Sequence, residues 1–519
     1  MPSNFSRIYS AELEGIEAKL VEVETDLHVG LHAFNIVGLA DKALSEAKER
    51  VNSALKNSGV KPPNKENRKI VINLAPADLK KTGSQYDLAI AVGYLLATKQ
   101  IKDFNASDKL FIGELALDGS LRPVNGALNI ARLCKKLKLK TLFLPKANAT
   151  EAALLNNLEI IPLENLKQTV DYLESKAAIE PQSPTKINDR GAMAAVDLAE
   201  IKGQENAKRA LEIAAAGAHN LLMTGSPGGG KTMLAQALVS LLPPLSLNEV
   251  IEVTQICSAT GLLKESPFVQ GRPFRAPHHS ASAVAVIGGG AFPRPGEITL
   301  AHRGVLFLDE LPEFHRDLLE ALRQPLEAGW VSIARARKNL ELPARFMLVA
   351  AMNPCPCGYQ GDEAKECICT AKEFLHYQKK ISGPLLDRID LQVNVPRVEI
   401  KELRVKNSEL NSNQTTVIKK KILKARKKQL ERFKSLKQKM LTNSEMSSRL
   451  CDRLIKLSSA AEDFISRVFD KSLISARGYY RILKVAQTIA DLEELDIVEE
   501  KHLSEAFAYR VRAPSIPGL

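Results

Sequence analysis

A loop able to bind phosphate is the clearest chemical feature of the sequence. Residues 225–232 spell G-S-P-G-G-G-K-T, with two glycines, a lysine and a hydroxyl at the spacing typical of nucleotide phosphate loops. The apolar residues before it predict a buried strand, and residues 233–242 predict a helix. Backbone N–H groups at a helix N-terminus attract anions. We therefore predict that ATP is bound by Gly225, Ser226, Pro227, Gly228, Gly229, Gly230, Lys231 and Thr232.

The same pattern assigns roles to a few polar side chains. The Lys231 ammonium would reach the β- and γ-phosphates, and the Thr232 hydroxyl would ligate Mg²⁺. Farther along, Asp309 and Glu310 directly follow four apolar residues, V-L-F-L, which predict a buried strand. Asp309 would hold Mg²⁺, and Glu310 would act as general base on the attacking water.

Three further residues resemble two nucleotide sensors and a trans-acting arginine of AAA+ ATPases. Asn353 ends a predicted core strand and resembles the first sensor, although an amide at a strand end can also be only a cap. Arg388 resembles the arginine that reaches the γ-phosphate of a neighbouring subunit; its alternative is an ion pair with Asp387 or Asp390. Arg477 resembles the second sensor.

The first part of the chain alternates short apolar strands with helices and predicts a separate α/β domain. Residues 81–91 and 112–126 resemble the proteolytic domain of Lon, a family that uses a serine–lysine dyad. Gln85 stands where the nucleophilic serine belongs, Leu128 stands where the lysine belongs, and Ser84 is one position off without an evident base. The resemblance implies a Lon-like fold without peptidase activity, with an unusual active protease as the alternative.

Several longer motifs resemble one family in particular. Residues 271–280, 287–290, 293–310 and 352–358 are closely similar to the ComM/YifB family of magnesium-chelatase-like AAA+ proteins. The resemblance implies a ring, expected to be hexameric, that uses ATP to drive branch migration of recombination junctions during natural transformation. It covers essentially the whole chain.

The predicted fold class is α/β, with a parallel-sheet AAA+ core that carries the phosphate loop. A chain of 519 residues is too long for one hydrophobic core. We expect a Lon-like α+β domain, a linker containing two prolines, the ATPase core of magnesium-chelatase type and a helical C-terminal lid. The corresponding residues are 1–175, 176–195, 196–395 and 396–519.

The charge balance favours a polyanionic partner. The formal net charge is +12, from 72 Lys and Arg against 60 Asp and Glu. In this group of ATPases a hairpin before the sensor strand points into the ring pore, where Arg335, Arg337 and Lys338 would grip DNA phosphates. The alternative is a solvated hairpin tip. A basic helix predicted over residues 419–439 has an apolar face at Ile418, Ile422 and Leu423, and such a charge run is usually only solvated.

A second candidate metal site lies after the sensor. Four of the seven cysteines, Cys355, Cys357, Cys367 and Cys369, fall within residues 355–369. Four thiolates suit tetrahedral zinc, although the C-x-C spacing is tighter than the usual C-x₂-C, and the alternative is four reduced thiols. The adjacent His278 and His279 are expected to point to opposite faces of an extended loop near the pore rather than to bind metal.

Composition limits the remaining hypotheses. The N-terminal residues lack the apolar run of a signal peptide, and no stretch approaches the length of a membrane span, so we expect a cytoplasmic protein without a membrane partner. The leading hypothesis is an ATP-driven motor on single-stranded or branched DNA. The alternatives are a chelatase-like remodeller of a protein partner and a nucleotide-gated scaffold.

Overall fold

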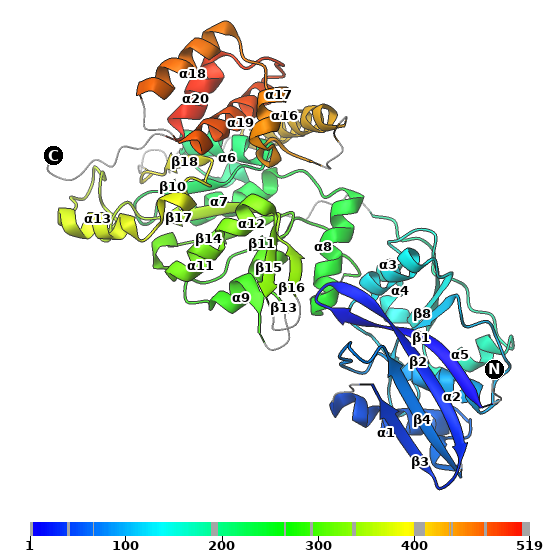
Figure 1. The fold of residues 1–519 in the computed structure, drawn as a ribbon. Coiled ribbons are helices and arrows are strands. Elements are labelled where there is room, and N and C mark those ends of the chain that lie inside the picture. The colour runs from blue at the N-terminus through cyan, green and yellow to red at the C-terminus, as the bar shows by residue number, and fades with distance from the viewer. Residues whose placement is uncertain are drawn as a thin grey trace. The chain divides into compact units, whose positions relative to one another are not determined.

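Figure 1 shows the fold of the chain in a computed structural model. The structure describes residues 4–38, 42–65, 67–187, 196–263, 266–290, 294–334, 339–398, 410–434, 436, 440–471 and 475–510. The chain forms two compact units, each with its own core. The first comprises Met1–Asn188 and Ser246–Val269, and the second comprises Asp189–Leu245 and Gln270–Leu519.

The first unit contains a mixed seven-stranded sheet in the order β3-β4-β2-β1-β5-β8-β9. β1 pairs antiparallel with β2 and β2 with β4, whereas the other neighbours are parallel. Its strands are β1 (Phe5–Glu14), β2 (Glu17–Val29), β3 (Ala33–Val37), β4 (Arg68–Ala75), β5 (Lys109–Phe111), β8 (Thr141–Pro145) and β9 (Glu159–Leu163), with β6 (Glu114–Leu115) and β7 (Leu121–Arg122) forming a separate pair. Its helices are α1 (Lys42–Asn57), α2 (Asp87–Ala97), α3 (Ala127–Leu137), α4 (Lys146–Ala152), α5 (Leu166–Leu173) and α8 (Leu247–Thr260), with a 3₁₀ turn at Pro63–Lys65.

Alternating side chains bury both faces of this sheet. Phe143 belongs to one apolar cluster with α2, whereas its neighbours Leu142 and Leu144 belong to another with α3 and α4. Successive side chains of a strand point to opposite faces, so a strand covered on both sides is apolar throughout. β2 instead alternates, with Val21 and Val23 buried between glutamates, as the sequence pattern predicted.

The segment 246–269 belongs to the first unit although it follows the phosphate loop in sequence. α8 packs against α3, and the Gln255 side chain accepts a hydrogen bond of 2.8 Å from Arg132. The Ser258 hydroxyl bonds the buried Glu151 carboxylate, and its backbone carbonyl accepts from the Gly126 N–H at 3.1 Å. No local sequence pattern predicts that α8 joins the first unit, because α8 is an ordinary capped helix whose partner lies more than a hundred residues upstream.

The second unit contains a five-stranded sheet in the order β11-β14-β17-β10-β18. All of its neighbouring strands run parallel. The strands are β10 (Leu221–Thr224), β11 (Phe274–Arg275), β14 (Val305–Leu308), β17 (Met347–Met352) and β18 (Leu391–Asn394), beside the short pairs β12 (Gly288–Gly289) with β13 (Arg294–Pro295) and β15 (Trp330–Ala334) with β16 (Asn339–Pro343). Around them lie α6 (Glu205–Gly217), α7 (Lys231–Leu241), α9 (Ala283–Ile287), α10 (Glu297–Leu300), α11 (Arg316–Ala321), α12 (Arg323–Ala328), α13 (Ala371–Lys379) and α14 (Gly383–Leu386), with 3₁₀ turns at Leu198–Glu200 and Leu311–Glu313.

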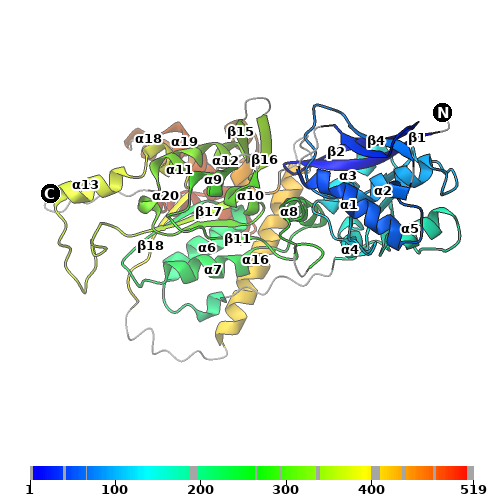
Figure 2. The ribbon, with the colours of Figure 1, turned by 90° about the horizontal axis from the view of Figure 1, so that it is seen from below.

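Helices cover both faces of this parallel sheet. Figure 2 shows α6 and α7 on one face and α11 and α12 on the other. Parallel sheets require this arrangement because each crossover places a helix on a face and leaves the strands buried. The architecture is an α/β fold with a parallel sheet, as the sequence predicted for this part of the chain.

The C-terminal helices share a core with the α6 face (Figure 1, orange and red). They are α16 (Leu410–Phe433), α17 (Ser448–Leu454), α18 (Ser459–Lys471), α19 (Ala476–Leu492) and α20 (Glu500–Ala508), with a 3₁₀ turn at Asn443–Glu445. Ala425 and Gln429 of α16 are buried, and the Gln429 side chain donates to the Ala216 carbonyl at 3.0 Å. These helices are therefore tied to the sheet-bearing part of the same unit.

Two expectations about the basic helix are corrected. The helix ends at Phe433 rather than continuing to residue 439, because Phe433 turns into a small apolar cluster with Met440 and Met446. Leu423 is 48% exposed and does not share the buried face of Ile422. At about 100° per residue the buried stripe continues from Ile418 and Ile422 to Ala425, which leaves Leu423 on another side. Among the helices of the described residues, each is too short or too polar to cross a lipid bilayer.

Candidate nucleotide-binding site

The predicted phosphate loop connects β10 to α7, as a nucleotide site requires. α7 begins at Lys231, so the lysine and the Thr232 hydroxyl occupy its first turn. Gly228 and Gly230 have φ of +80° and +86°, and no atom lies within 4 Å of a Cβ built on either. Positive φ favours glycine, and the open space leaves the backbone accessible to an anion. Gly225 is required for another reason, since a Cβ there would lie 1.9 Å from the Val395 carbonyl oxygen.

The Lys231 ammonium lies inside this loop. Its Nζ donates to the carbonyl oxygens of Gly225 and Ser226 at 2.7 and 3.0 Å, and to Asn353 Oδ1 at 3.2 Å. Burial lowers the pKa of Lys231, and the nearby Asp309 carboxylate opposes that shift. A phosphate group would supply the negative charge that this partly buried ammonium lacks.

The acidic pair lies beside the loop because of the strand order. β14 and β10 both flank β17 in parallel, with Leu308 opposite Ala350 and Thr224 opposite Met352. The carboxyl ends of these strands therefore meet at one edge, which is where open α/β sheets bind ligands. The Thr232 hydroxyl donates to Asp309 Oδ2 at 3.0 Å, so the two predicted Mg²⁺ ligands are in contact. A hydroxyl and a carboxylate suit Mg²⁺.

Glu310 is held in an unusual conformation by its neighbours. Its backbone φ is +53°, a value that non-glycine residues rarely adopt. Its carboxylate Oε2 lies 3.0 Å from Nδ1 of His279. His279 comes from the loop after β11, the strand that pairs with β14, so the sheet brings the imidazole to the candidate base.

The histidine pair corrects one expectation. The rings of His278 and His279 lie 4.1 Å apart between centroids and are tilted by 35°, so they do not point to opposite faces. The segment is a turn rather than an extended strand: the His278 Nδ1 lies 2.8 Å from the Ser280 hydroxyl. The expectation of opposite faces was wrong because it assumed an extended backbone at His278 and His279.

Asn353 lies at the end of β17 and lines a cavity beside Glu310. The cavity has a volume of about 380 Å³, and its lining includes Glu310, Glu313, Asn353, Pro356, Tyr377 and Lys380. The Lys380 ammonium lies 3.1 Å from each Glu313 carboxylate oxygen. The cavity thus combines the candidate base and sensor with groups of both charge signs.

The two predicted arginines meet at one carboxylate. Arg388 Nη2 lies 2.6 Å from Glu327 Oε1, and Arg477 Nη2 lies 3.5 Å from the same oxygen. Arg388 is 3% exposed and also donates from Nη1 to the Pro384 carbonyl at 2.6 Å. The alternative partners proposed for it are occupied elsewhere: Asp387 pairs with Arg510 at 3.3 Å, and Asp390 pairs with Arg481. The trans-acting role of Arg388 and the sensor role of Arg477 remain predictions.

A buried ion cluster connects α19, the helix of Arg477, to the sheet. Asp390 precedes β18 and contacts Arg481 of α19, while its Oδ2 lies 3.4 Å from His219 Nδ1. Burial alone would raise the pKa of Asp390, but Arg481 and His219 outweigh it and hold the pKa below its ordinary value. A buried carboxylate kept ionised by these partners fixes the position of α19 relative to β18.

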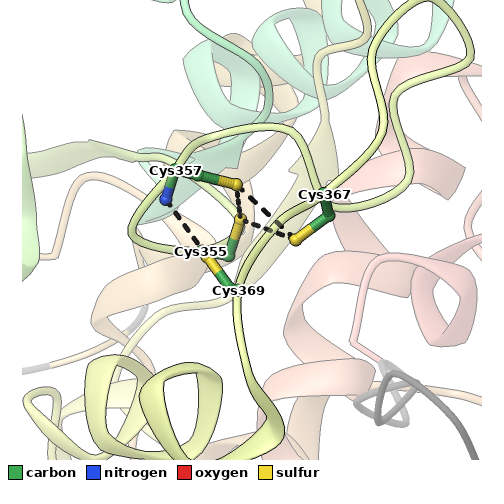
Figure 3. A group of neighbouring side chains, drawn as sticks. All are labelled: Cys355, Cys357, Cys367 and Cys369. Atoms are coloured by element: carbon green, nitrogen blue, oxygen red, sulfur yellow. Dashed lines mark hydrogen bonds between the residues drawn. The ribbon is translucent and has the colours of Figure 1, made fainter.

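The four clustered cysteines converge, as Figure 3 shows. Cys355 Sγ lies 3.3 Å from Cys357 Sγ and 3.7 Å from Cys367 Sγ, and the last two sulfurs are 3.5 Å apart. All four Sγ atoms lie within 4.8 Å of one another. Within the described residues this is the one group of three or more His, Cys, Asp or Glu side chains close enough to share an ion.

The electrostatics of this cluster suit a cation. Burial alone would raise the pKa of Cys357. The backbone N–H groups of Tyr359 and Ile368 outweigh burial and lower the pKa to about 6. Burial and the neighbouring sulfurs raise the pKa of Cys369 to about 12. One thiolate thus forms readily and disfavours the next, which is the situation that a bound metal cation relieves.

The basic hairpin is present in part. β15 and β16 pair antiparallel from Trp330 opposite Pro343 to Ala334 opposite Asn339, and the chain then enters β17. The two extended arms are therefore confirmed. Arg335, Arg337 and Lys338 lie outside the described residues, and their contact with DNA stays a prediction.

The residues that align with the serine–lysine dyad of Lon have the following contacts in the structure. Gln85 donates from Nε2 to Glu12 Oε2 at 3.0 Å, and Ser84 donates to the Glu114 carboxylate. Leu128 is fully buried near the start of α3. The serine therefore has an acidic partner that the sequence did not indicate, and the absence of peptidase activity stays a prediction.

Several contributing residues were not found from the sequence. They are His279 as a contact of Glu310, Glu327 as the shared partner of the arginines, and Gly358 and Asp362 beside the phosphate loop. An isolated acid or glycine carries no local signal of such a role. Only the double-histidine motif stood out, and its position against Glu310 depends on the pairing of β11 with β14.

Comparison with known proteins finds similarity to the same protein family in three successive segments of the chain. Residues 23–148 match the family described as subunit ChlI of Mg-chelatase, residues 197–403 match magnesium chelatase, subunit ChlI, and residues 412–510 match its C-terminal part. Competence protein ComM of Haemophilus influenzae is 42% identical over 508 residues, which cover 97% of each chain. The YifB protein of Escherichia coli is 41% identical over 98% of this chain and 97% of its own. A magnesium-chelatase subunit ChlI of Euglena gracilis is 26% identical over 26% of this chain and 45% of its own. The chain therefore belongs to the ComM/YifB family of magnesium-chelatase-like AAA+ proteins, a family that implies ATPase activity with ATP and Mg²⁺.

Proposed function

We propose that the protein is an ATP-driven motor acting on single-stranded or branched DNA. The observation that carries this proposal is the meeting of Lys231, Asp309 and Asn353 at the carboxyl ends of three adjacent parallel strands. A net charge of +12 favours a polyanionic track. The likeness to competence protein ComM supports a role in natural transformation. We infer a cytoplasmic hexameric ring that drives branch migration in recombination intermediates.

The side chains of the site can divide the work of hydrolysis. Bound ATP and Mg²⁺ would supply the phosphoryl group and the cation that neutralises its oxygens. The ammonium of Lys231 would exchange its carbonyl partners for phosphate oxygens, while Thr232 and Asp309 would hold the cation. The carboxylate of Glu310 would accept the proton of the attacking water, and the amide of Asn353 would orient that water.

The hairpin formed by β15 and β16 could couple ATP hydrolysis to movement of bound DNA. It leads directly into β17, the strand that Asn353 follows, so a shift at the sensor can reach the hairpin tip. Cations at such a tip would hold backbone phosphates without reading bases.

Replacing two of the three basic residues at the hairpin tip tests whether the hairpin binds DNA. Arg335→Ala with Arg337→Ala is expected to keep basal ATPase activity and lose DNA stimulation and unwinding of a synthetic four-way junction. Each lost phosphate contact should lower the salt slope of binding by about one unit, so the slope should fall by about two. The same measurements on Lys420→Ala with Lys421→Ala, two exposed lysines of α16, provide the matched control. If the hairpin variant shows unchanged DNA stimulation, junction unwinding and salt slope, the hairpin does not bind DNA, and α16 becomes the candidate DNA-binding element.

The second candidate is a remodeller of a protein partner. The observation that favours it is the match of all three chain segments to a magnesium-chelatase subunit. DNA-independent ATP hydrolysis that requires an added protein would support this alternative over the DNA motor.

We also propose that the cysteine cluster holds structural zinc. Zinc–sulfur bonds of about 2.3 Å in a tetrahedron place sulfurs about 3.8 Å apart, near the separations of 3.3 to 3.7 Å found between these sulfur atoms. The donor set of four thiols is typical of closed, structural zinc sites.

Metal analysis tests this assignment. Freshly prepared, reduced protein is expected to carry about one zinc per chain, and Cys355→Ser is expected to lose the metal and thermal stability, because zinc binding contributes to folding. Cys451→Ser, at a buried cysteine of α17 outside the cluster, is the matched control and should keep the zinc. Wild-type protein without zinc would rule the site out.

A further inference from the structure

The cysteine-bearing segment also forms one side of the nucleotide site. The segment of residues 355–369, called the cysteine loop, connects the sensor strand β17 to α13. Cys355 follows Asn353 by only two residues, and Pro356 lines the same cavity as Glu310 and Asn353. The loop thus lies beside the two side chains, Glu310 and Asn353, that are proposed to act on the attacking water.

Two contacts join the cysteine loop to the phosphate loop itself. Gly358 approaches Pro227 so closely that an added Cβ would lie 2.8 Å from its Cδ. The Ser226 side chain lies close to the Asp362 carboxyl and, with the Ala364 N–H, holds the pKa of that carboxyl below its ordinary value. Ser226 and Pro227 are both members of the phosphate-binding motif.

The cysteine loop has little regular structure or apolar burial of its own. It contains no helix or strand, and most of its side chains from residue 361 onward are exposed, including Ile368 at 86%. The fully buried cysteine is Cys355. A segment with so little apolar burial has low local stability unless it is cross-linked. A metal that joins Cys355 and Cys357 to Cys367 and Cys369 would close the loop covalently at both ends.

We propose that metal bound by the four cysteines braces the cysteine loop against the phosphate loop, so that metal occupancy sets the affinity for ATP. The inference rests on the nucleotide and zinc sites proposed above. Loss of the metal would release Asp362 from Ser226 and Gly358 from Pro227, and the phosphate loop would lose one supporting wall. ATP binding would then have to order the cysteine loop again, and this cost lowers the apparent affinity for ATP.

The test compares zinc-loaded, zinc-free and reloaded full-length protein. Zinc is removed by a chelator under reducing conditions, the chelator is dialysed away, and a fluorescent ATP analogue is titrated with Mg²⁺ present. The Kd is expected to rise about five-fold without zinc, the change that one ordinary hydrogen bond makes. Adding one equivalent of Zn²⁺ should restore it.

A loop variant separates bracing from general unfolding. Asp362→Ala keeps all four cysteines and should retain one zinc per chain, yet show the same rise in Kd as the zinc-free protein. Glu363→Ala removes the adjacent exposed acid and should bind the analogue like the wild type. If zinc binds and its removal leaves the Kd unchanged, or if Asp362→Ala matches Glu363→Ala, the coupling is wrong while both sites stand. Failure to bind zinc overturns the inference together with the zinc site, and failure of zinc-loaded protein to bind the analogue overturns it together with the proposed function.

Discussion

Lys231→Ala is expected to weaken ATP binding, whereas Glu310→Gln is expected to bind ATP and fail to turn it over. Lys231 offers a charge-assisted contact to phosphate that is worth about 1.5–3 kcal/mol, so its loss should raise the Kd about 10- to 100-fold. Glu310→Gln preserves shape and leaves Thr232, Asp309 and the glycine backbone in place. It removes the proton acceptor, which should cost about 10²- to 10⁴-fold in kcat.

Equilibrium titration and single-turnover hydrolysis distinguish the two variants. Because Glu310 also contacts His279 at 3.0 Å, His279→Ala is the matched comparison: it removes the contact and leaves the carboxylate. Its remaining turnover measures how much of the Glu310→Gln loss comes from that contact. Equal losses of ATP affinity in the Lys231 and Glu310 variants would contradict the separate roles given to them.

Arg388→Ala is expected to keep nucleotide binding and lose hydrolysis, if its guanidinium acts on the nucleotide of a neighbouring subunit. Mixing this variant with Lys231→Ala protein should then restore part of the activity. In mixed rings some interfaces would join an intact Lys231 to an intact Arg388, and only those interfaces would be complete. ATPase activity across a series of mixing ratios, with mixed assembly shown independently, is the measurement.

The structure supplies the control for this experiment. Arg388 is buried against Glu327 at 2.6 Å, and a trans-acting group would have to leave that partner. Glu327→Gln breaks the ion pair and retains the guanidinium. If Arg388 serves only to hold α12, the two variants should lose thermal stability and activity together, and no mixing ratio should restore hydrolysis. Recovery with Arg388→Ala, alongside an active Glu327→Gln, would establish the trans role.

The sequence by itself determined the local chemistry of the nucleotide site. The glycine–lysine–threonine spacing, the apolar run before Asp309 and the strand before Asn353 each predicted an element that the structure contains. Their accuracy has a physical reason. Fully apolar runs of four to six residues are typical of strands in a covered parallel sheet, and glycines at positive φ mark the turn. The clustering of four cysteines within one short loop was likewise visible, because residues so near in sequence can converge through a single loop.

Tertiary structure alone decided which distant groups meet. The order β11-β14-β17-β10-β18 brings His279 to Glu310 and Asn353 to Lys231, and no local pattern encodes the order of strands in a sheet. The same holds for Glu327 with Arg388 and for the return of α8 to α3, since each pair is set by long-range packing. The exposed Leu423 shows the same limit within one helix. The sequence pattern marked α16 as amphipathic, but its packing against α6 and α19 decided which residues became buried.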